Sequence, residues 1–204
     1  ATGFLGRHCV RLLLESYPEA RLVLLVREKH RRNGVSRDPS LWGRSDSSGE
    51  DFGGRERIQR LFGDASRSRC GLSPEDYARA VEGTTRVIHA AAAVRFNSPP
   101  GEARAINVEG TRRLLELASE AQRQGTLRSF THIGTAFVAG ERQGIVREDE
   151  LDAGQCFRNT YEETKFEAEK LVRAKSESMP CVILRPSIIV GDSRTGVTRS
   201  FRTL

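Results

Sequence analysis

The stretch "TGFLGRHCVRLLLESYPEARLVLLVR" (residues 2–27) places a glycine-rich turn, an amphipathic helix and a buried strand in succession. Apolar residues recur near helical spacing in "FLGRHCVRLLLES" (residues 4–16), which predicts a helix there. "RLVLLVR" (residues 21–27) is a short, continuous apolar run, as expected of a strand buried on both faces of a parallel sheet. A helix followed by such a strand is typical of an α/β fold.

Strands and helices continue to alternate along the chain. Further strands are predicted in "RIQRLFGD" (57–64), "TRVIHAAAAV" (85–94), "LRSFTHIGTAFV" (127–138) and "CVILRPSIIVG" (181–191). Further helices are predicted in "LSPEDYARAVEG" (72–83), "PGEARAINVEGTRRLLELASEAQRQG" (100–125) and "NTYEETKFEAEKLVRAKSE" (159–177). The alternation predicts one α/β domain over residues 1–204, a Rossmann-like, doubly wound parallel sheet. We expect this domain to lack the first strand of the sheet.

One long segment interrupts the alternation. Residues 28–56 are polar and rich in Gly, Ser and Asp, which predicts a mobile insertion. The densest basic run, "VREKHRRNG" (26–34), contributes to a net charge of +6. It has no interleaved aromatic residues, and the chain carries no nucleic-acid-binding motif, so no nucleic-acid partner is predicted. The alternatives are a solvated basic loop and a site for a phosphate-bearing cofactor.

Cysteine usage and hydropathy exclude several other classes. The four cysteines form no CxxC pair, which argues against a zinc site and fits free thiols in a reducing cytoplasm. We therefore expect no metal and a cytoplasmic location. No stretch approaches the roughly 18 apolar residues of a transmembrane helix. The first residues lack the pattern of a signal peptide.

The opening turn has the chemistry of a phosphate site. Gly3 and Gly6 stand three residues apart where a helix begins. Glycine lets the backbone approach a pyrophosphate, and a helix N-terminus offers free N–H groups and the positive end of its dipole. The alternative is an ordinary glycine-rich start to a helix.

Two residues follow predicted strands where a dinucleotide fold contacts its cofactor. Arg27 ends the strand "LVLLVR", a position where an arginine accommodates the 2′-phosphate of NADP and an acidic residue would bind the ribose of NAD. Asp64 follows the next strand, where it can accept a hydrogen bond from an adenine amino group. A solvated arginine and a loop aspartate are the alternative readings of these two positions.

Small side chains end another strand, in "HAAAAV" (89–94). Ligands of open α/β sheets bind at the carboxyl ends of the strands, and alanines there leave room for a cofactor. Close packing of strand against helix is the alternative. His89 is expected to be a packed histidine rather than a catalytic one.

The strongest chemical signal is "YEETK" (161–165). Tyr161 and Lys165 lie one helical turn apart and share a helix face. A nearby ammonium lowers the pKa of a tyrosine, which can then exchange a proton with an alkoxide. The strand "LRSFTHIGTAFV" delivers Thr135, whose hydroxyl can bind a substrate carbonyl beside Tyr161. Asn107, in the long predicted helix, can hold a water that relays protons to Lys165.

Taken in order, "TGFLG", "LLVR", "GD", "HAAAAV", "NVEGT", "GTAFVAG", "YEETK" and "RPSIIVGDSRTG" resemble the extended short-chain dehydrogenase/reductase superfamily. The chain is most similar to its thioester reductase and fatty acyl-CoA reductase (male sterility-like) branch. "LLVR", the insertion that follows it, "TAFVAG" and "RPSIIVGDSRTG" carry that similarity. Epimerases and dehydratases of the superfamily more often place a tyrosine-glycine pair where this chain has Ala139-Gly140.

The resemblance implies specific roles. Thr135, Tyr161 and Lys165 would be catalytic, with Asn107 in support. The implied contacts with NADPH fall on Thr2, Gly3, Phe4, Leu5, Gly6, Arg27, Asp64, Ala91, Ala92, Lys165, Pro186 and Ser187. Within that set, residues 3–6 would lie against the pyrophosphate, and residues 186–187 beside the nicotinamide. The chain departs from the family pattern at Gly134, where serine is common. It also departs in its missing first glycine and in lacking the C-terminal substrate-binding segment of the family.

The activity implied is transfer of hydride from NADPH to an acyl thioester or carbonyl, with Tyr161 as proton donor. Coenzyme A or an acyl carrier protein would present the substrate. The alternatives are a sugar-nucleotide epimerase or dehydratase, a hydroxysteroid-type dehydrogenase, and a non-catalytic NADP-binding sensor or interaction protein.

Overall fold

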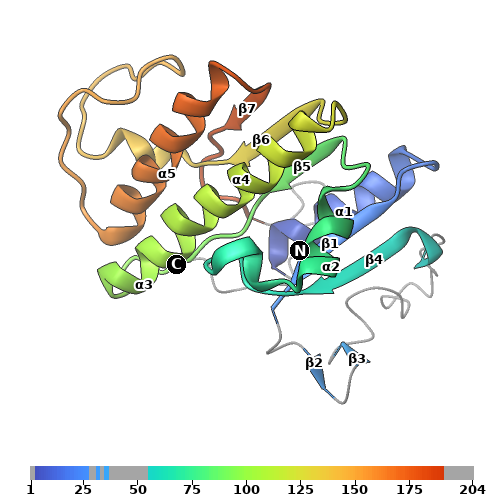
Figure 1. The fold of residues 1–204 in the computed structure, drawn as a ribbon. Helices are drawn as coiled ribbons and strands as arrows, with labels where there is room; N and C mark the ends of the chain where they lie inside the picture. The colour runs from blue at the N-terminus through green and yellow to red at the C-terminus, as the bar shows by residue number, and fades with distance from the viewer. Residues whose placement is uncertain (1–2, 28–30, 33–34, 37–54, 191–204) are drawn as a thin grey trace. The chain divides into compact units, whose positions relative to one another are not determined.

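A computed structural model describes residues 3–27, 31–32, 35–36 and 55–190 (Figure 1). The chain divides into two compact units, residues 1–64 with 188–204 and residues 65–187. Most of the predicted insertion at 28–56 lies outside the described residues. Within it, β2 (Arg31–Arg32) and β3 (Val35–Ser36) form a short antiparallel pair.

The first unit contains one helix on a two-stranded parallel sheet. Its elements are α1 (Phe4–Ser16), β1 (Leu22–Val26), the short helix η3 (Arg55–Arg57) and β4 (Ile58–Phe62). Its core joins the apolar face of α1 to the strands through Val10, Leu14, Leu24 and Val26. The bounds of α1 are those predicted from the spacing of its apolar residues.

Arg57 fixes the direction of α1 against this sheet. Its guanidinium donates hydrogen bonds to the carbonyls of Leu14, Tyr17 and Ala20. Because Arg57 directly precedes β4, the C-terminal end of α1 lies at the amino end of that strand. The first turn of α1 therefore points toward the carboxyl edge of the sheet.

The second unit contains a three-stranded, all-parallel sheet in the order β5-β6-β7. Its strands are β5 (Arg86–His89), β6 (Ser129–Ile133) and β7 (Cys181–Leu184). Its helical segments are η4 (Ser68–Gly71), α2 (Pro74–Val81), α3 (Pro100–Arg104), the π-helical turn η5 (Ala105–Glu109), α4 (Gly110–Arg123), η6 (Ala136–Ala139) and α5 (Thr160–Ser176). Every predicted strand and helix is present, so the α/β class is confirmed.

Helices α4 and α5 run side by side over one face of this sheet (Figure 1). Strand positions alternate between that face and the opposite one, so every second side chain enters the core. The core residues are Leu115 and Ala118 of α4, Phe130 of β6, Val172 of α5 and the following Met179. The same alternation turns His89 and His132 toward the helices, where both are fully buried.

The two sheets have the pairings of a doubly wound fold. In the strand order 3-2-1-4-5-6 of such folds, strands 3 and 2 pair on one side of strand 1 and strands 4, 5 and 6 on the other. The pairs β4-β1 and β5-β6-β7 correspond to these two groups. Within the described part of the chain, no helix combines the length and the apolar character needed to cross a membrane.

Helix caps explain where two of these helices begin. Ser73 accepts a hydrogen bond from the backbone N–H of Asp76 at 3.1 Å, as its position before Pro74 predicts. Asn159 accepts one from the N–H of Glu162 at 3.0 Å and starts α5 one residue before Tyr161. The second cap therefore places Tyr161 in the first turn of its helix.

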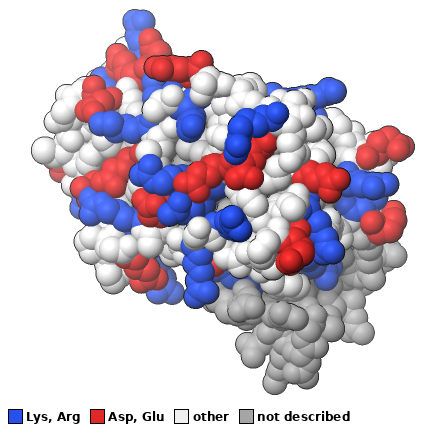
Figure 2. Space-filling model, in the orientation of Figure 1, with Lys and Arg blue, Asp and Glu red and all other residues white. Residues whose placement is uncertain are grey.

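Basic and acidic side chains are interspersed on the face drawn in Figure 2, where neither sign forms a continuous patch. Much of this mixing comes from ion pairs within and between helices. Arg113 pairs with Glu116 along α4, and Arg104 of α3 pairs with Glu167 of α5. The net charge of +6 is therefore not gathered into a single basic surface on this face.

Candidate active site

The predicted catalytic hydroxyls meet where β6 ends. Thr135 follows β6 by two residues and caps η6, where its Oγ1 accepts a hydrogen bond from the N–H of Phe137 at 3.3 Å. Its side chain also lies close enough to the Tyr161 hydroxyl to influence the pKa of that phenol. The structure thus brings Thr135 and Tyr161 together, although they come from different elements of the chain.

Tyr161 keeps its proton at neutral pH. Burial raises the pKa of Tyr161, and the nearby side chain of Thr135 opposes this rise. The prediction that Lys165 lowers the pKa of Tyr161 is wrong for this structure. The ammonium of Lys165 is directed to other partners, so the desolvation of the phenol determines the direction of the shift.

Lys165 is buried below Tyr161 on the same face of α5, with only 2% of its surface exposed. Its Nζ donates a hydrogen bond to the carbonyl of Ile133 at 2.8 Å and lies 3.5 Å from Nε2 of His132. Burial lowers the pKa of Lys165 to about 8, against the opposing charge of Glu169. The ammonium has three hydrogens, so one remains for another acceptor.

Asn107 lies in the π-helical turn η5 and is fully buried. Its Oδ1 accepts from the N–H of Ala93 at 2.7 Å, and its Nδ2 donates to the carbonyl of Ala93 at 3.2 Å and to Oγ1 of Thr164 at 2.9 Å. Both amide hydrogens are therefore used within the protein. The predicted water relay finds no free donor on this side chain, which instead ties the loop after β5 to α5.

The two histidines of the sheet are neutral. Thr111 donates its hydroxyl proton to the carbonyl of Asn107 at 2.6 Å, so the Nε2 of His89, 2.9 Å from Thr111 Oγ1, is the donor to Thr111. Burial and the charge of Lys165 lower the pKa of His89 to about 3. His89 is thus the packed histidine that the sequence predicts. The same causes, with His89 added, lower the pKa of His132 to about 2.

The other residues predicted in the second unit lie at the carboxyl edge of its sheet. Ala91 and Ala92 follow β5, and Ala92 is partly buried. Pro186 follows β7, and its carbonyl accepts from the N–H of Ala136 at 2.9 Å. This bond holds Pro186 beside Thr135, and the exposed Ser187 comes next.

The predicted cofactor residues of the first unit share the corresponding edge of their own sheet. Gly3 is the N-cap of α1, and the first turn that follows it, with Phe4, Leu5 and Gly6, carries no acidic side chain. A β-carbon built on Gly3 would meet no atom within 4 Å among the described residues. The N–H of Gly63 bonds to the carbonyl of Val26 at 2.9 Å, so Arg27 and Asp64 lie at neighbouring strand ends. Thr2 lies outside the described residues.

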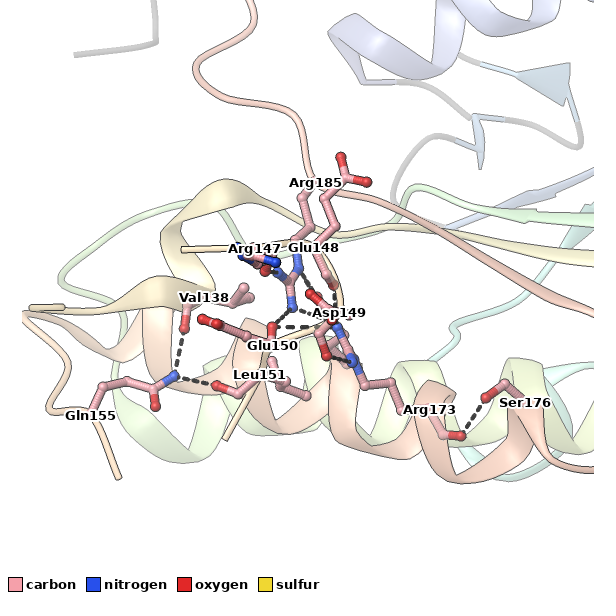
Figure 3. A network of polar contacts seen from close by, with 11 residues as sticks. Val138, Arg147, Glu148, Asp149, Glu150, Leu151, Gln155, Arg173, Ser176 and Arg185 are labelled. Carbon is pink, nitrogen blue, oxygen red and sulfur yellow. Dashed lines mark hydrogen bonds and ion pairs between the residues drawn. The ribbon is translucent and has the colours of Figure 1, made fainter. Parts of the chain in front are cut away.

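The buried carboxylate of Glu169 stabilises the end of β7 next to the candidate site. Glu169, 0% exposed, accepts hydrogen bonds from Arg173 at 2.9 Å and from both Nε and Nη2 of Arg185. The two guanidinium groups also donate to the backbone of the loop 147–150, as Figure 3 shows. Arg185 directly precedes Pro186, so this network anchors the end of β7 beside Thr135.

Sequence reasoning missed His132 and Glu169. His132 alternates with Phe130 in β6, a pattern that places both on the helix-covered face. Glu169 stands four residues from both Lys165 and Arg173, a spacing that resembles an exposed ladder of charges. Among the residues that the structure describes, no group of three His, Cys, Asp or Glu side chains is arranged to hold a metal ion.

Gly140, the last residue of "TAFVAG", allows a close backbone approach. Its φ is +59°, and a β-carbon there would lie 2.2 Å from the carbonyl oxygen of Cys156. We expect Gly140→Ala to lower the free energy of unfolding by about 3 kcal/mol, from backbone strain and overpacking together. Gly144 also has a positive φ but open space around it, so Gly144→Ala should cost about 1 kcal/mol. Urea unfolding of both variants checks this, and equal losses would contradict it.

These features define a class, the Rossmann-type domains of the extended short-chain dehydrogenase/reductase kind. Within that class, the chain belongs to the family described as Male sterility protein, whose NAD-binding family model matches residues 1–204.

Individual relatives agree with this family. The chain is 27% identical to "Fatty acyl-CoA reductase wat" of Drosophila melanogaster and 30% identical to human "Fatty acyl-CoA reductase 1". These matches cover 97% and 93% of the chain but only 43% and 42% of the relatives. The crystal structure of the terminal R domain of the myxalamid PKS-NRPS pathway has a TM-score of 0.79 and 32% identity, over 96% of this chain and 49% of that one. The chain therefore spans less than half of each of these proteins.

Proposed function

We propose that this chain is the cofactor-binding part of an NADPH-dependent reductase that acts on an acyl thioester, presented by coenzyme A or an acyl carrier protein. The observation that carries the proposal is that Thr135 and Tyr161 interact at the end of β6, beside the buried Lys165. Relatives named as fatty acyl-CoA reductases, and a similar R domain from a PKS-NRPS pathway, support the thioester as substrate.

The two hydroxyls are suited to bind and protonate one oxygen. A carbonyl oxygen can accept hydrogen bonds from both Thr135 and Tyr161, because their side chains lie near each other at the end of β6. Reduction needs a proton donor for the oxygen as negative charge develops on it. The raised pKa of Tyr161 keeps the phenol protonated at neutral pH, which is the form that the reductive direction requires.

Lys165 binds the cofactor in this proposal. Its third ammonium hydrogen is available to a ribose hydroxyl of the cofactor, since Ile133 and His132 engage the other two. Neutral His132 suits this position, because a charged imidazolium would repel the ammonium.

The residues present fit a nicotinamide dinucleotide. The α1 N-terminus offers free N–H groups with no acidic side chain in its first turn, which suits a pyrophosphate. Arg27 is exposed and has no ion-pair partner among the described residues, which suits a 2′-phosphate. When bound, the cofactor would supply the hydride, and the side chains above would supply position, charge and the proton.

An assay of the whole gene product tests this proposal. We expect NADPH to be oxidised in the presence of octanoyl-CoA or an octanoylated carrier protein, and NADH to be used at least about tenfold less well. Arg27→Ala should raise the KM for NADPH about tenfold and leave that for NADH within about twofold. Arg21→Ala, an exposed arginine at the other end of the same β-strand, is the matched control.

The outcomes separate the competing activities. Absence of acyl-dependent NADPH oxidation would contradict the proposal. Oxidation of a secondary alcohol or interconversion of a nucleotide sugar would instead support an epimerase or dehydrogenase. Tight NADPH binding without turnover of any substrate class would support a sensor.

A further inference from the structure

Three aromatic rings of the second unit gather beside the candidate reaction centre. Phe96, in the loop after β5, has its ring centroid 5.7 Å from that of Tyr161 and 6.3 Å from that of Phe137. The residue is 54% exposed, although a large apolar side chain is ordinarily buried. An exposed aromatic ring next to polar reacting groups is typical of the lining of a ligand-binding site.

The backbone that carries these rings is tied to the site itself. Two hydrogen bonds between Ala93 and Asn107, one donated by each residue, hold the base of the Phe96 loop. The N–H of Phe137 donates to Oγ1 of Thr135, so Phe137 positions that hydroxyl while its ring contacts Phe96. The rings of Phe96 and Phe137 and the hydroxyls of Thr135 and Tyr161 therefore form one local arrangement.

We propose that Phe96 and Phe137 bind the apolar acyl chain of the substrate next to its carbonyl carbon and so set the preference for chain length. This inference rests on the proposed function. With the carbonyl oxygen at Thr135 and Tyr161, the substituents of the carbonyl carbon extend past the adjacent rings. Methylene groups lose contact with water when they pack on those rings. The amide groups of a thiol carrier arm would find no hydrogen-bond partner on the ring faces. The rings of Phe96 and Phe137 therefore suit the acyl chain rather than the carrier arm.

Chain-length dependence tests the inference in the whole gene product, with NADPH saturating. Phe96→Ala should lower kcat/KM for octanoyl-CoA about tenfold or more and that for acetyl-CoA by less than about threefold. Phe96→Leu keeps an apolar side chain and should retain most of the octanoyl preference. Phe137→Ala should act in the same direction as Phe96→Ala. Val94→Ala is the matched control, because Val94 lies in the same loop and is 66% exposed.

A binding measurement keeps this inference separate from the proposed function. In the Tyr161→Phe background, calorimetry with octanoyl-CoA and acetyl-CoA should show an octanoyl preference that Phe96→Ala removes. The wild-type protein could turn over no thioester and still show the octanoyl preference in binding, with that preference removed by Phe96→Ala. In that case the proposed function fails and the acyl site stands. If Phe96→Ala affects both esters equally, or neither, in turnover and in binding, the acyl site is overturned whatever the activity.

Discussion

Replacement of Tyr161 by phenylalanine is expected to reduce kcat for thioester reduction by about 10²–10⁴-fold, the usual contribution of a positioned proton donor. The variant keeps the ring that packs against Phe96 and loses only the hydroxyl near Thr135. Its thermal unfolding midpoint should therefore stay close to that of the wild type. Steady-state NADPH oxidation with octanoyl-CoA measures the change in rate.

Tyr17 offers the matched control for this experiment. Tyr17 is 60% exposed, and Tyr17→Phe should leave kcat within about twofold of the wild type. A Tyr161→Phe protein that retained kcat within about threefold would show that the proton comes from another group. A fall in KM for NADPH without a fall in kcat would also contradict a role in proton transfer.

Glu169→Gln is expected to lower the free energy of unfolding by about 3 kcal/mol. The substitution preserves the shape of the side chain but removes the charge that balances Arg173 and Arg185. Arg185, with 11% of its side chain exposed, would then keep a largely buried charge without a carboxylate. Because Arg185 also holds the loop 147–150, that loop should become more accessible to protease. Urea unfolding and limited proteolysis measure the two effects.

Glu167 is the control on the same helix. It pairs with Arg104 at 2.8 Å, but 43% of the arginine and 30% of the glutamate side chain are exposed. Exposed pairs contribute little, so Glu167→Gln should cost less than about 1 kcal/mol. Equal stability of the two glutamine variants would show that burial of the carboxylate does not explain the contribution of Glu169 to the free energy of unfolding.

Where strands and helices lie was largely predictable, because apolar periodicity reports local structure directly. The bounds of α1 match the prediction, whereas the strand predicted to reach Val138 ends at Ile133. It ends there because Thr135 uses its side chain to cap η6. The helix predicted over residues 100–125 contains the π-helical turn η5, and periodicity does not mark that irregularity.

The candidate site was predictable in its members and not in their interactions. The spacing of Tyr161 and Lys165 places both on one face of α5, as observed. The same spacing does not reveal that Lys165 donates a hydrogen bond to Ile133, which lies on strand β6. Nor does it reveal that Phe96 and Phe137 come together beside Tyr161, because those three residues are brought together only when the loop after β5 packs near α5.

The amino-acid sequence was enough to predict the alternation of strands and helices, the Thr135, Tyr161 and Lys165 set, and the family resemblance. All of these are carried by residue types and local spacing. The charge states and partners of those residues follow from the folded structure instead. Burial lowers the pKa values of Lys165 and His132 and raises that of Tyr161. Desolvation and through-space contacts arise between segments far apart in the chain, so no local pattern can encode them.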